Sequence, residues 1–198
     1  MPELTIIAGC NGSGKSTYAK SFIREHLTSF DYDKLFLQTY DSLLDSDFRE
    51  EIAKNMTTTA FEKAANDAIQ SKTDFCYETN FDTHPVFWAE KFAEAGFTLN
   101  LIFFCLENQE IARNRIEVRT ENKGHFVNNK TIDFKWNTGY KNANIHYQLF
   151  DNILIVDNSK HNEVFTNLVQ MESGQIELMT DELPDYFERR FPTIFHML

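Results

Sequence analysis

The chain carries, close to its N-terminus, the stretch Gly9-Cys10-Asn11-Gly12-Ser13-Gly14-Lys15-Ser16-Thr17. It fits the pattern G-x-x-x-x-G-K-[ST], in which glycines let backbone N–H groups curl around phosphate oxygens. The lysine of this pattern reaches the β- and γ-phosphates, and the hydroxyl that follows it binds Mg²⁺. The stretch therefore predicts a nucleotide-phosphate site with Ser16 as metal ligand. Its residues are Gly9, Asn11, Gly12, Ser13, Gly14, Lys15, Ser16 and Thr17.

The residues on either side of this loop agree with that prediction. Leu4 to Ala8 is a short apolar run, typical of a buried strand. Apolar residues from Tyr18 to Leu27 recur at a spacing of four, which predicts an amphipathic helix packed on a sheet. The alternative is a chance glycine-rich turn. It is disfavoured because the chain has only 7 glycines and three of them fall in this loop.

Composition limits the class of protein. With 198 residues, 42% of them apolar and 25% charged, the chain is expected to form one soluble domain. A net charge of -11 argues against a nucleic-acid partner and against an anionic membrane surface. Cys10, Cys76 and Cys105 show no metal-ligand spacing and no disulfide framework. With no signal peptide and no membrane-spanning run in the sequence, we expect a cytoplasmic protein.

The remaining pattern alternates strands and helices. Helices are predicted from Ser46 or Asp47 to about residue 68, from Pro85 to Gly96, from Asn108 to about Thr120, and around Trp136. Core strands are predicted at 75–77, 99–105 and 153–156. This order predicts an α/β fold, a three-layer P-loop NTPase with a mostly parallel sheet. We expect residues 1–163 to form a kinase domain with a helical lid at about 112–130. Residues 164–198 should add a C-terminal hairpin-plus-helix extension, with the helix from about Asp181.

A cationic stripe marks the predicted lid. Arg115, Arg119 and Lys123 are spaced by four, so a helix places them on one face. Like charges at this spacing destabilise a helix unless an anion compensates. We therefore predict phosphate contacts for Arg115 and Arg119. Arg113 is different, because Glu117 lies four residues on and can pair with it.

Acidic residues follow two predicted elements. Glu78 and Asn80 end the strand 75–77, and ligands of open α/β sheets lie outside the carboxyl ends of strands. We predict that they bind substrate; Glu78 could equally hold a Mg²⁺-bound water. Asp31 and Asp33 lie in the turn after the first helix, where a carboxylate could accept the proton of an attacking hydroxyl.

Taken together, these stretches resemble the zeta-toxin family of P-loop kinases. The family's A-G-x-N-G-x-G-K-S-T is matched from Ala8 to Thr17, with Cys10 where proline is usual. Its N-x-D-E turn is matched in part at 31–34, its F-x-x-E-T-x at 75–80, its R-V-x-x-R-V-x-x-G-G-H lid at 115–125 and its D-N-S at 157–159. Lys135 stands where the family often has a further arginine.

The resemblance implies an ATP- and Mg²⁺-dependent kinase that phosphorylates a hydroxyl of a small acceptor. For toxin members the acceptor is UDP-N-acetylglucosamine. It also implies an antitoxin-type protein partner. The catalytic residues would be Lys15, Asp33, Arg115 and Arg119, with Asp33 as the base.

Two other classes remain to be weighed. A switch GTPase should show N-K-x-D, but Asn129-Lys130-Thr131-Ile132 lacks the aspartate. A motor ATPase should end an apolar strand in Asp-Glu, and Glu78 follows Tyr77 instead. A P-loop NTPase or nucleotide-binding regulatory protein without an acceptor would leave the lid arginines without a role. The role of 157–159 stays open between capping a helix and touching the nucleotide base.

Overall fold

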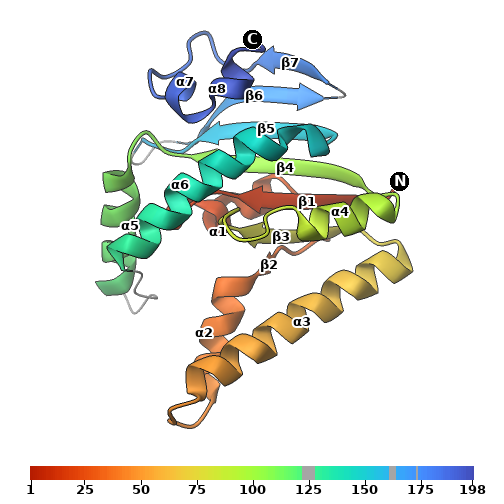
Figure 1. Cartoon of the computed structure of the whole chain (residues 1–198), viewed down its shortest axis with the longest axis vertical. Helices are drawn as coiled ribbons and strands as arrows, with labels where there is room; N and C mark the ends of the chain where they lie inside the picture. The colour runs from red at the N-terminus through yellow and green to blue at the C-terminus, as the bar shows by residue number, and fades with distance from the viewer. Residues whose placement is uncertain (122–127, 161–163, 173) are drawn as a thin grey trace.

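The computed structural model describes residues 1–121, 128–160, 164–172 and 174–198. A seven-stranded sheet with the order β2-β3-β1-β4-β5-β6-β7 runs through the molecule (Figure 1). The first five strands in this order are parallel, and β6 and β7 add to the sheet antiparallel. The strands are β1 (Glu3–Ala8), β2 (Phe30–Asp31), β3 (Phe75–Thr79), β4 (Thr98–Cys105), β5 (Asn152–Asp157), β6 (Thr166–Glu172) and β7 (Gln175–Leu178). The predicted α/β fold with a mostly parallel sheet is confirmed.

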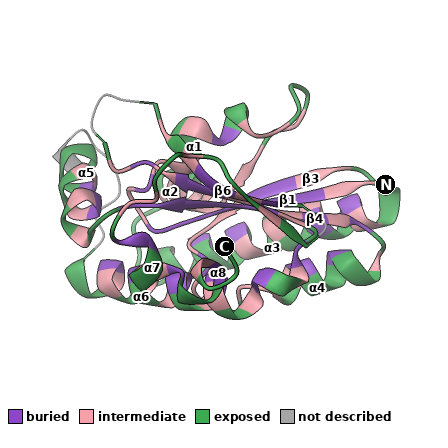
Figure 2. Ribbon diagram, turned by 90° about the horizontal axis from the view of Figure 1, so that it is seen from above, coloured by how far each residue is buried: buried purple, intermediate pink, exposed green. Residues whose placement is uncertain are grey.

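Helices cover one face of the sheet well. The helices of the described residues are α1 (Lys15–Tyr18), α2 (Tyr32–Ser42), α3 (Arg49–Ser71), α4 (Phe87–Glu94), α5 (Gln109–Glu121), α6 (Asn129–His146), α7 (Phe187–Arg190) and α8 (Pro192–Phe195), with 3₁₀ turns η1 (Ala19–Ser21) and η2 (Tyr147–Leu149). Five of them, α3, α4, α6, α7 and α8, lie on the same side of the sheet (Figure 2). Phe81, Phe103, Trp136 and Phe191 are fully or almost fully buried between these helices and the strands. Burial of large aromatic surface is the main source of stability of this layer.

The opposite face carries a thinner layer. The helix predicted to reach Leu27 is wrong in its length, because α1 ends at Tyr18 and η1 at Ser21. Ser16, Thr17, Tyr18 and Ser21 are weak helix formers that fall in and just after α1. Its apolar residues still pack as predicted, since Phe22 and Leu27 join a second cluster around Phe104.

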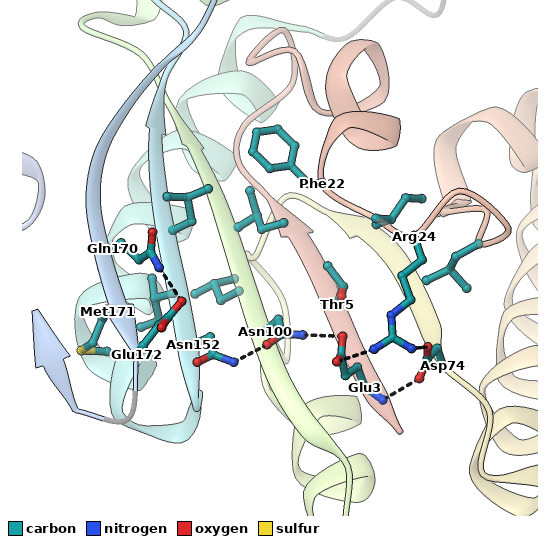
Figure 3. Close-up of a pocket in the computed structure, with 16 residues that line it drawn as sticks. Glu3, Thr5, Phe22, Arg24, Asp74, Asn100, Asn152, Gln170, Met171 and Glu172 are labelled. Atoms are coloured by element: carbon teal, nitrogen blue, oxygen red, sulfur yellow. Dashed lines mark hydrogen bonds and ion pairs between the residues drawn. The ribbon is translucent and has the colours of Figure 1, made fainter. Parts of the chain in front are cut away.

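The part of this face that α1 leaves uncovered is lined by a polar row (Figure 3). Arg24 pairs with Glu3 at 2.7 Å and with Asp74 at 2.6 Å. Asn152 donates to Asn100 at 2.7 Å, and Asn100 donates to Glu3 at 3.5 Å. These side chains border a cavity of about 310 Å³ and largely satisfy one another. A solvated row of this kind lets a strand face stay exposed without a covering helix.

The α2–α3 hairpin projects from the sheet beyond β2 (Figure 1). The turn predicted around Asp31 and Asp33 is instead β2 followed by the first turn of α2. Asp31 ends β2 and accepts the Lys34 backbone N–H at 3.0 Å, which caps α2. The predicted long helix exists as α3 but begins after Phe48. Ile52 and Met56, part of its apolar spacing, are exposed because this half of α3 lies beyond the sheet.

The C-terminal residues complete the main core. β6 and β7 form the predicted hairpin. The helix predicted from about Asp181 is wrong in position, since α7 begins at Phe187. Pro184 disfavours helical geometry in the residue before it, and its carbonyl accepts the Phe187 N–H at 2.8 Å. None of the helices in the described ranges is long and apolar enough to cross a membrane.

Candidate active site

The loop between β1 and α1 has the geometry of a phosphate cradle. Gly9, Gly12 and Gly14 all have positive φ, of 139°, 79° and 100°. A Cβ atom at Gly9 would lie 2.4 Å from the carbonyl oxygen of Phe104, and one at Gly14 would lie 2.2 Å from Asn158 Nδ2. Only glycine fits both the backbone conformation and the available space at these positions.

Lys15 folds over this loop. Its Nζ donates to the carbonyl oxygens of Gly9 at 2.7 Å and Cys10 at 3.1 Å, and to Asn80 Oδ1 at 3.3 Å. Burial lowers the pKa of the Lys15 ammonium, and the nearby negative charges of Asp33 and Glu78 oppose that shift. A buried cation held by neutral oxygens is well placed to meet phosphate charge.

Two polar atoms of the loop are left without partners. Ser13 Oγ and Asn11 Oδ1 are buried and accept or donate no hydrogen bond among the described residues. Buried polar atoms are normally satisfied, so these two atoms are free to form hydrogen bonds with a ligand held in the loop. Both lie in the segment that the sequence predicts to hold phosphate.

Ser16 joins the loop to two strand ends. Its hydroxyl lies 2.5 Å from Glu78 Oε2 and 3.1 Å from Asp31 Oδ2. Because β2 and β3 are parallel and pair Asp31 with Glu78, both carboxylates point toward this hydroxyl. Burial raises the pKa of the Glu78 carboxyl, as does the neighbouring charge of Asp31, against the hydrogen bond from Ser16. A hydroxyl with two carboxylates is an oxygen donor set that suits Mg²⁺.

Asp33 lies on the other side of the loop. It occupies the first turn of α2, and its Oδ2 accepts from Asn11 Nδ2 at 3.4 Å. The structure thus separates the two acids of this turn: Asp31 faces Ser16, whereas Asp33 faces Asn11.

The predicted cationic residues come from α5 and α6. Arg115 Nη1 donates to the Gly12 carbonyl at 3.4 Å. Arg115, Arg119 and Lys135 all line a cavity of about 1280 Å³ that begins at the glycine-rich loop. Arg113 does form an ion pair, but with Asp133 of α6 instead of the predicted Glu117. The packing of α5 against α6 decides that partner. Lys123, Gly124 and His125 lie outside the described residues.

The cavity of about 1280 Å³ extends from the loop toward the α2–α3 hairpin. Lys15, Ser16, Asp33, Glu78 and Asn80 all line it, as the sequence predicts. Its far end is formed by side chains that sequence reasoning did not find. They are Tyr32, Lys54, Thr58, Phe61, Asp82, His84 and Trp88. Asp82 and His84 follow a strand end and could have been suspected for that reason, but nothing in the sequence marks Lys54 or Phe61.

The sequence allows residues 157–159 either to cap a helix or to touch the nucleotide base, and the contacts of Asn158 show a third role. Its side chain is buried, with 6% exposed, and Nδ2 donates to the Ser13 carbonyl at 2.8 Å. Asp157 accepts from the backbone of Ser159, whose hydroxyl in turn accepts from Glu107 N–H at 2.7 Å. The residue that follows β5 therefore stabilises the conformation of the glycine-rich loop through a hydrogen bond to its backbone.

A comparison with protein-family models matches residues 1–170 to the zeta toxin family. The chain belongs to the zeta toxin family. The match spans the glycine-rich loop, Asp33, the end of β3 and the arginines of α5 together. A sequence search of curated proteins finds no match.

Solved structures share the fold of this family member. A structure of the PezAT chromosomal toxin–antitoxin system of Streptococcus pneumoniae aligns with a TM-score of 0.66 and 16% identity, over 97% of this chain and 84% of that one. A complex of AvrRxo1-ORF1 with AvrRxo1-ORF2 aligns with a TM-score of 0.69 and 11% identity, over 96% and 64%. A kinase-like protein of Chloroflexus aurantiacus aligns with a TM-score of 0.53 and 19% identity, over 68% and 75%. The fold is therefore that of P-loop kinases.

Proposed function

We propose that this protein is an ATP- and Mg²⁺-dependent kinase that transfers the γ-phosphate to a hydroxyl of a small acceptor. The observation that carries the proposal is the continuous cavity of about 1280 Å³ from the phosphate loop to the α2–α3 hairpin. A protein that only hydrolyses a nucleotide needs room for water beyond the γ-phosphate. This cavity leaves room for an organic acceptor. One solved neighbour, AvrRxo1-ORF1 with AvrRxo1-ORF2, is a complex with ATP, which supports ATP as the donor.

The phosphate loop would hold the donor. Backbone N–H groups of 9–17 bind the phosphates, and Lys15 gives up its contacts with loop carbonyls to meet the β- and γ-phosphates. Ser16, Glu78 and Asp31 fit a magnesium ion, directly or through water. When bound, the ion supplies charge neutralisation between the phosphates. Asn158 stabilises the loop conformation by donating a hydrogen bond to the Ser13 carbonyl.

Asp33 is the base of the proposed transfer. Its carboxylate accepts the proton of the acceptor O–H as that oxygen forms a bond to the γ-phosphorus. The bond between the γ-phosphorus and the β–γ bridging oxygen breaks, and ADP leaves. Arg115, Arg119 and Lys135 stabilise the charge on the transferring group from the lid side, since all three line the cavity.

The acceptor is proposed to be a nucleotide sugar such as UDP-N-acetylglucosamine. Membership of the zeta toxin family supports this class, and the aromatic side chains of Phe61, Tyr77 and Trp88 at the far end suit a planar base. We also propose an antitoxin-type protein partner, in line with the toxin–antitoxin system among the structural neighbours, and a cytoplasmic location.

The test is a thermal-shift screen of nucleotide sugars and other metabolites with an ATP analogue and Mg²⁺, followed by mass spectrometry of the products. We expect one acceptor class to raise the melting temperature and to gain the mass of one phosphoryl group. Lys15→Ala should abolish the transfer in a protein that still folds, because its ammonium supplies the contact to the β- and γ-phosphates. Tight ATP binding with no phosphorylated product from any acceptor would favour a regulatory nucleotide-binding protein. Unchanged turnover in folded Lys15→Ala protein would disprove the kinase.

A further inference from the structure

The loop between β3 and α4 lines the cavity in a strained backbone conformation. Phe81 and His84 both have positive φ, of 58° and 48°, although neither is glycine. Such conformations cost free energy and persist only where surrounding contacts hold them, often beside functional sites. The same loop carries Asn80, Asp82 and His84 to the cavity.

The α6 helix supplies contacts that hold this loop. Asn142 Nδ2 donates to the carbonyl oxygens of Phe81 at 2.8 Å and of Asp82 at 2.6 Å. One turn earlier, Gly139 brings the helix so close that a Cβ atom there would lie 2.7 Å from the Asn80 carbonyl oxygen. Three consecutive carbonyl groups of the loop therefore face one side of α6.

This contact bears on the phosphate site, because Asn80 Oδ1 lies 3.3 Å from Lys15 Nζ. A shift of the loop would move Asn80 away from Lys15 and move Asp82 and His84 within the acceptor end. Side chains that orient reacting groups are sensitive to displacements of about 1 Å.

We propose that Asn142 is a positioning residue, which with Gly139 clamps the strained β3–α4 loop to α6 and so sets the acceptor side of the active site. The proposal rests on the proposed kinase function only for its effect on turnover. The clamp itself is a statement about the loop and can be measured without an acceptor. Helix α6 also carries Lys135 to the cavity. The same helix therefore positions both Lys135 and the β3–α4 loop around the cavity.

The chain offers a matched control two residues further on. Asn144 is half-buried like Asn142, and its Nδ2 also donates to two carbonyl oxygens, those of Tyr140 at 2.9 Å and Arg190 at 2.7 Å. Both contacts lie outside the cavity lining. Asn144 Oδ1 also accepts from the Thr193 N–H at 3.3 Å. Asn144→Ala therefore removes at least as many hydrogen bonds from the same helix as Asn142→Ala, and only Asn142→Ala should reach the active site.

The experiment combines amide hydrogen exchange of residues 80–87 with the kinetics of ATP turnover, at a temperature where every variant is folded. Asn142→Ala should speed exchange of this segment and lower kcat by about tenfold or more, with the KM for ATP nearly unchanged. Asn144→Ala should change neither. Equal effects of the two variants would overturn the proposal, because a general loss of stability would then explain both.

Two further measurements test the clamp independently of Asn142→Ala and of the kinase proposal. Gly139→Ala improves helix propensity and places its methyl group against the Asn80 carbonyl, so it should disturb the same segment without weakening α6. Should Asn142→Ala fail to fold, unchanged exchange at 80–87 in Gly139→Ala would overturn the clamp. A wild-type protein without ATP turnover would remove the kinase proposal, while the exchange data would still confirm or overturn the clamp.

Discussion

The hydroxyl of Ser16 lies 2.5 Å from Oε2 of Glu78, two residues that are 62 positions apart in the chain. The contact joins the phosphate loop to the carboxyl end of β3. It also brings the predicted metal-binding hydroxyl into contact with a half-buried carboxylate. Burial raises the pKa of this carboxyl group. A magnesium ion between them would relieve the cost of burying that charge.

Glu78→Gln should therefore stabilise the metal-free protein at pH 8 and not at pH 4. The raised pKa means that the folded protein prefers the protonated acid, so this stabilising contribution is present at low pH. It is lost as pH rises through the pKa of the folded state. Glutamine cannot ionise, so the Glu78→Gln variant does not lose this contribution to its stability as the pH rises. Melting temperatures measured across this range in a chelating buffer test the difference.

Glu177→Gln is the control, because it changes net charge equally on an exposed residue of β7. A difference between Glu78→Gln and wild type that stays constant from pH 4 to pH 8 would contradict the assigned cause. With saturating Mg²⁺ and ATP the order should reverse, since the ion stabilises the wild-type carboxylate.

Arg119→Ala should lower kcat by ~10³-fold or more and change ATP affinity far less, because an arginine on the transferring phosphoryl group acts mainly in the transition state. Arg113→Ala is the comparison on the same helix. Its ion pair with Asp133 is half-exposed, so its loss should cost about 0–1 kcal/mol of stability. Steady-state kinetics with varied ATP separate kcat from KM. Similar losses of kcat in both variants would show that the cationic stripe has been misassigned.

Asp33→Asn should cut transfer to the acceptor by ~10²-fold or more, the usual range for the loss of a general base. Nucleotide binding should survive, since asparagine keeps the shape of the side chain. Asp31→Asn should act differently, raising the Mg²⁺ concentration needed for activity, because Asp31 faces Ser16. Single-turnover rates at several Mg²⁺ concentrations distinguish the two. If Asp31→Asn remains slow at saturating Mg²⁺ and Asp33→Asn does not, Asp31 is the base.

The thiols should be unreactive in the native protein at pH 8. Burial raises the pKa of Cys10 to about 11 and that of Cys76 to about 12, and Cys105 is raised for the same reason. All three side chains are buried, so a thiol reagent should label none until denaturant is added, and then all 3. Labelling of Cys10 in the native state would show that the phosphate loop opens, and ATP should then slow the reaction.

Local chemistry explains why the sequence alone predicted so much of this protein. Positive φ at Gly9, Gly12 and Gly14 follows from glycine's lack of a Cβ atom, so a short motif suffices to predict the loop. Apolar runs such as that ending at Cys105 predict buried strands, because a strand covered on both faces has no polar side. Strand order then places Glu78 at the phosphate crevice, as observed.

Other features depended on contacts between distant segments, which no local pattern records. Asp133 replaces Glu117 as the partner of Arg113 because α6 packs against α5. Phe61 reaches the cavity because α3 packs against Tyr77 of β3, and Lys54 because α3 packs against α2. Ile52 and Met56 are exposed because their half of α3 lies beyond the sheet. The sequence determined the conformation of the glycine-rich loop and which strands form the core, since both follow from covalent geometry and side-chain polarity. Only the tertiary structure decided which side chains complete the acceptor end and which hold its loop, because those roles arise from packing between helices far apart in the chain.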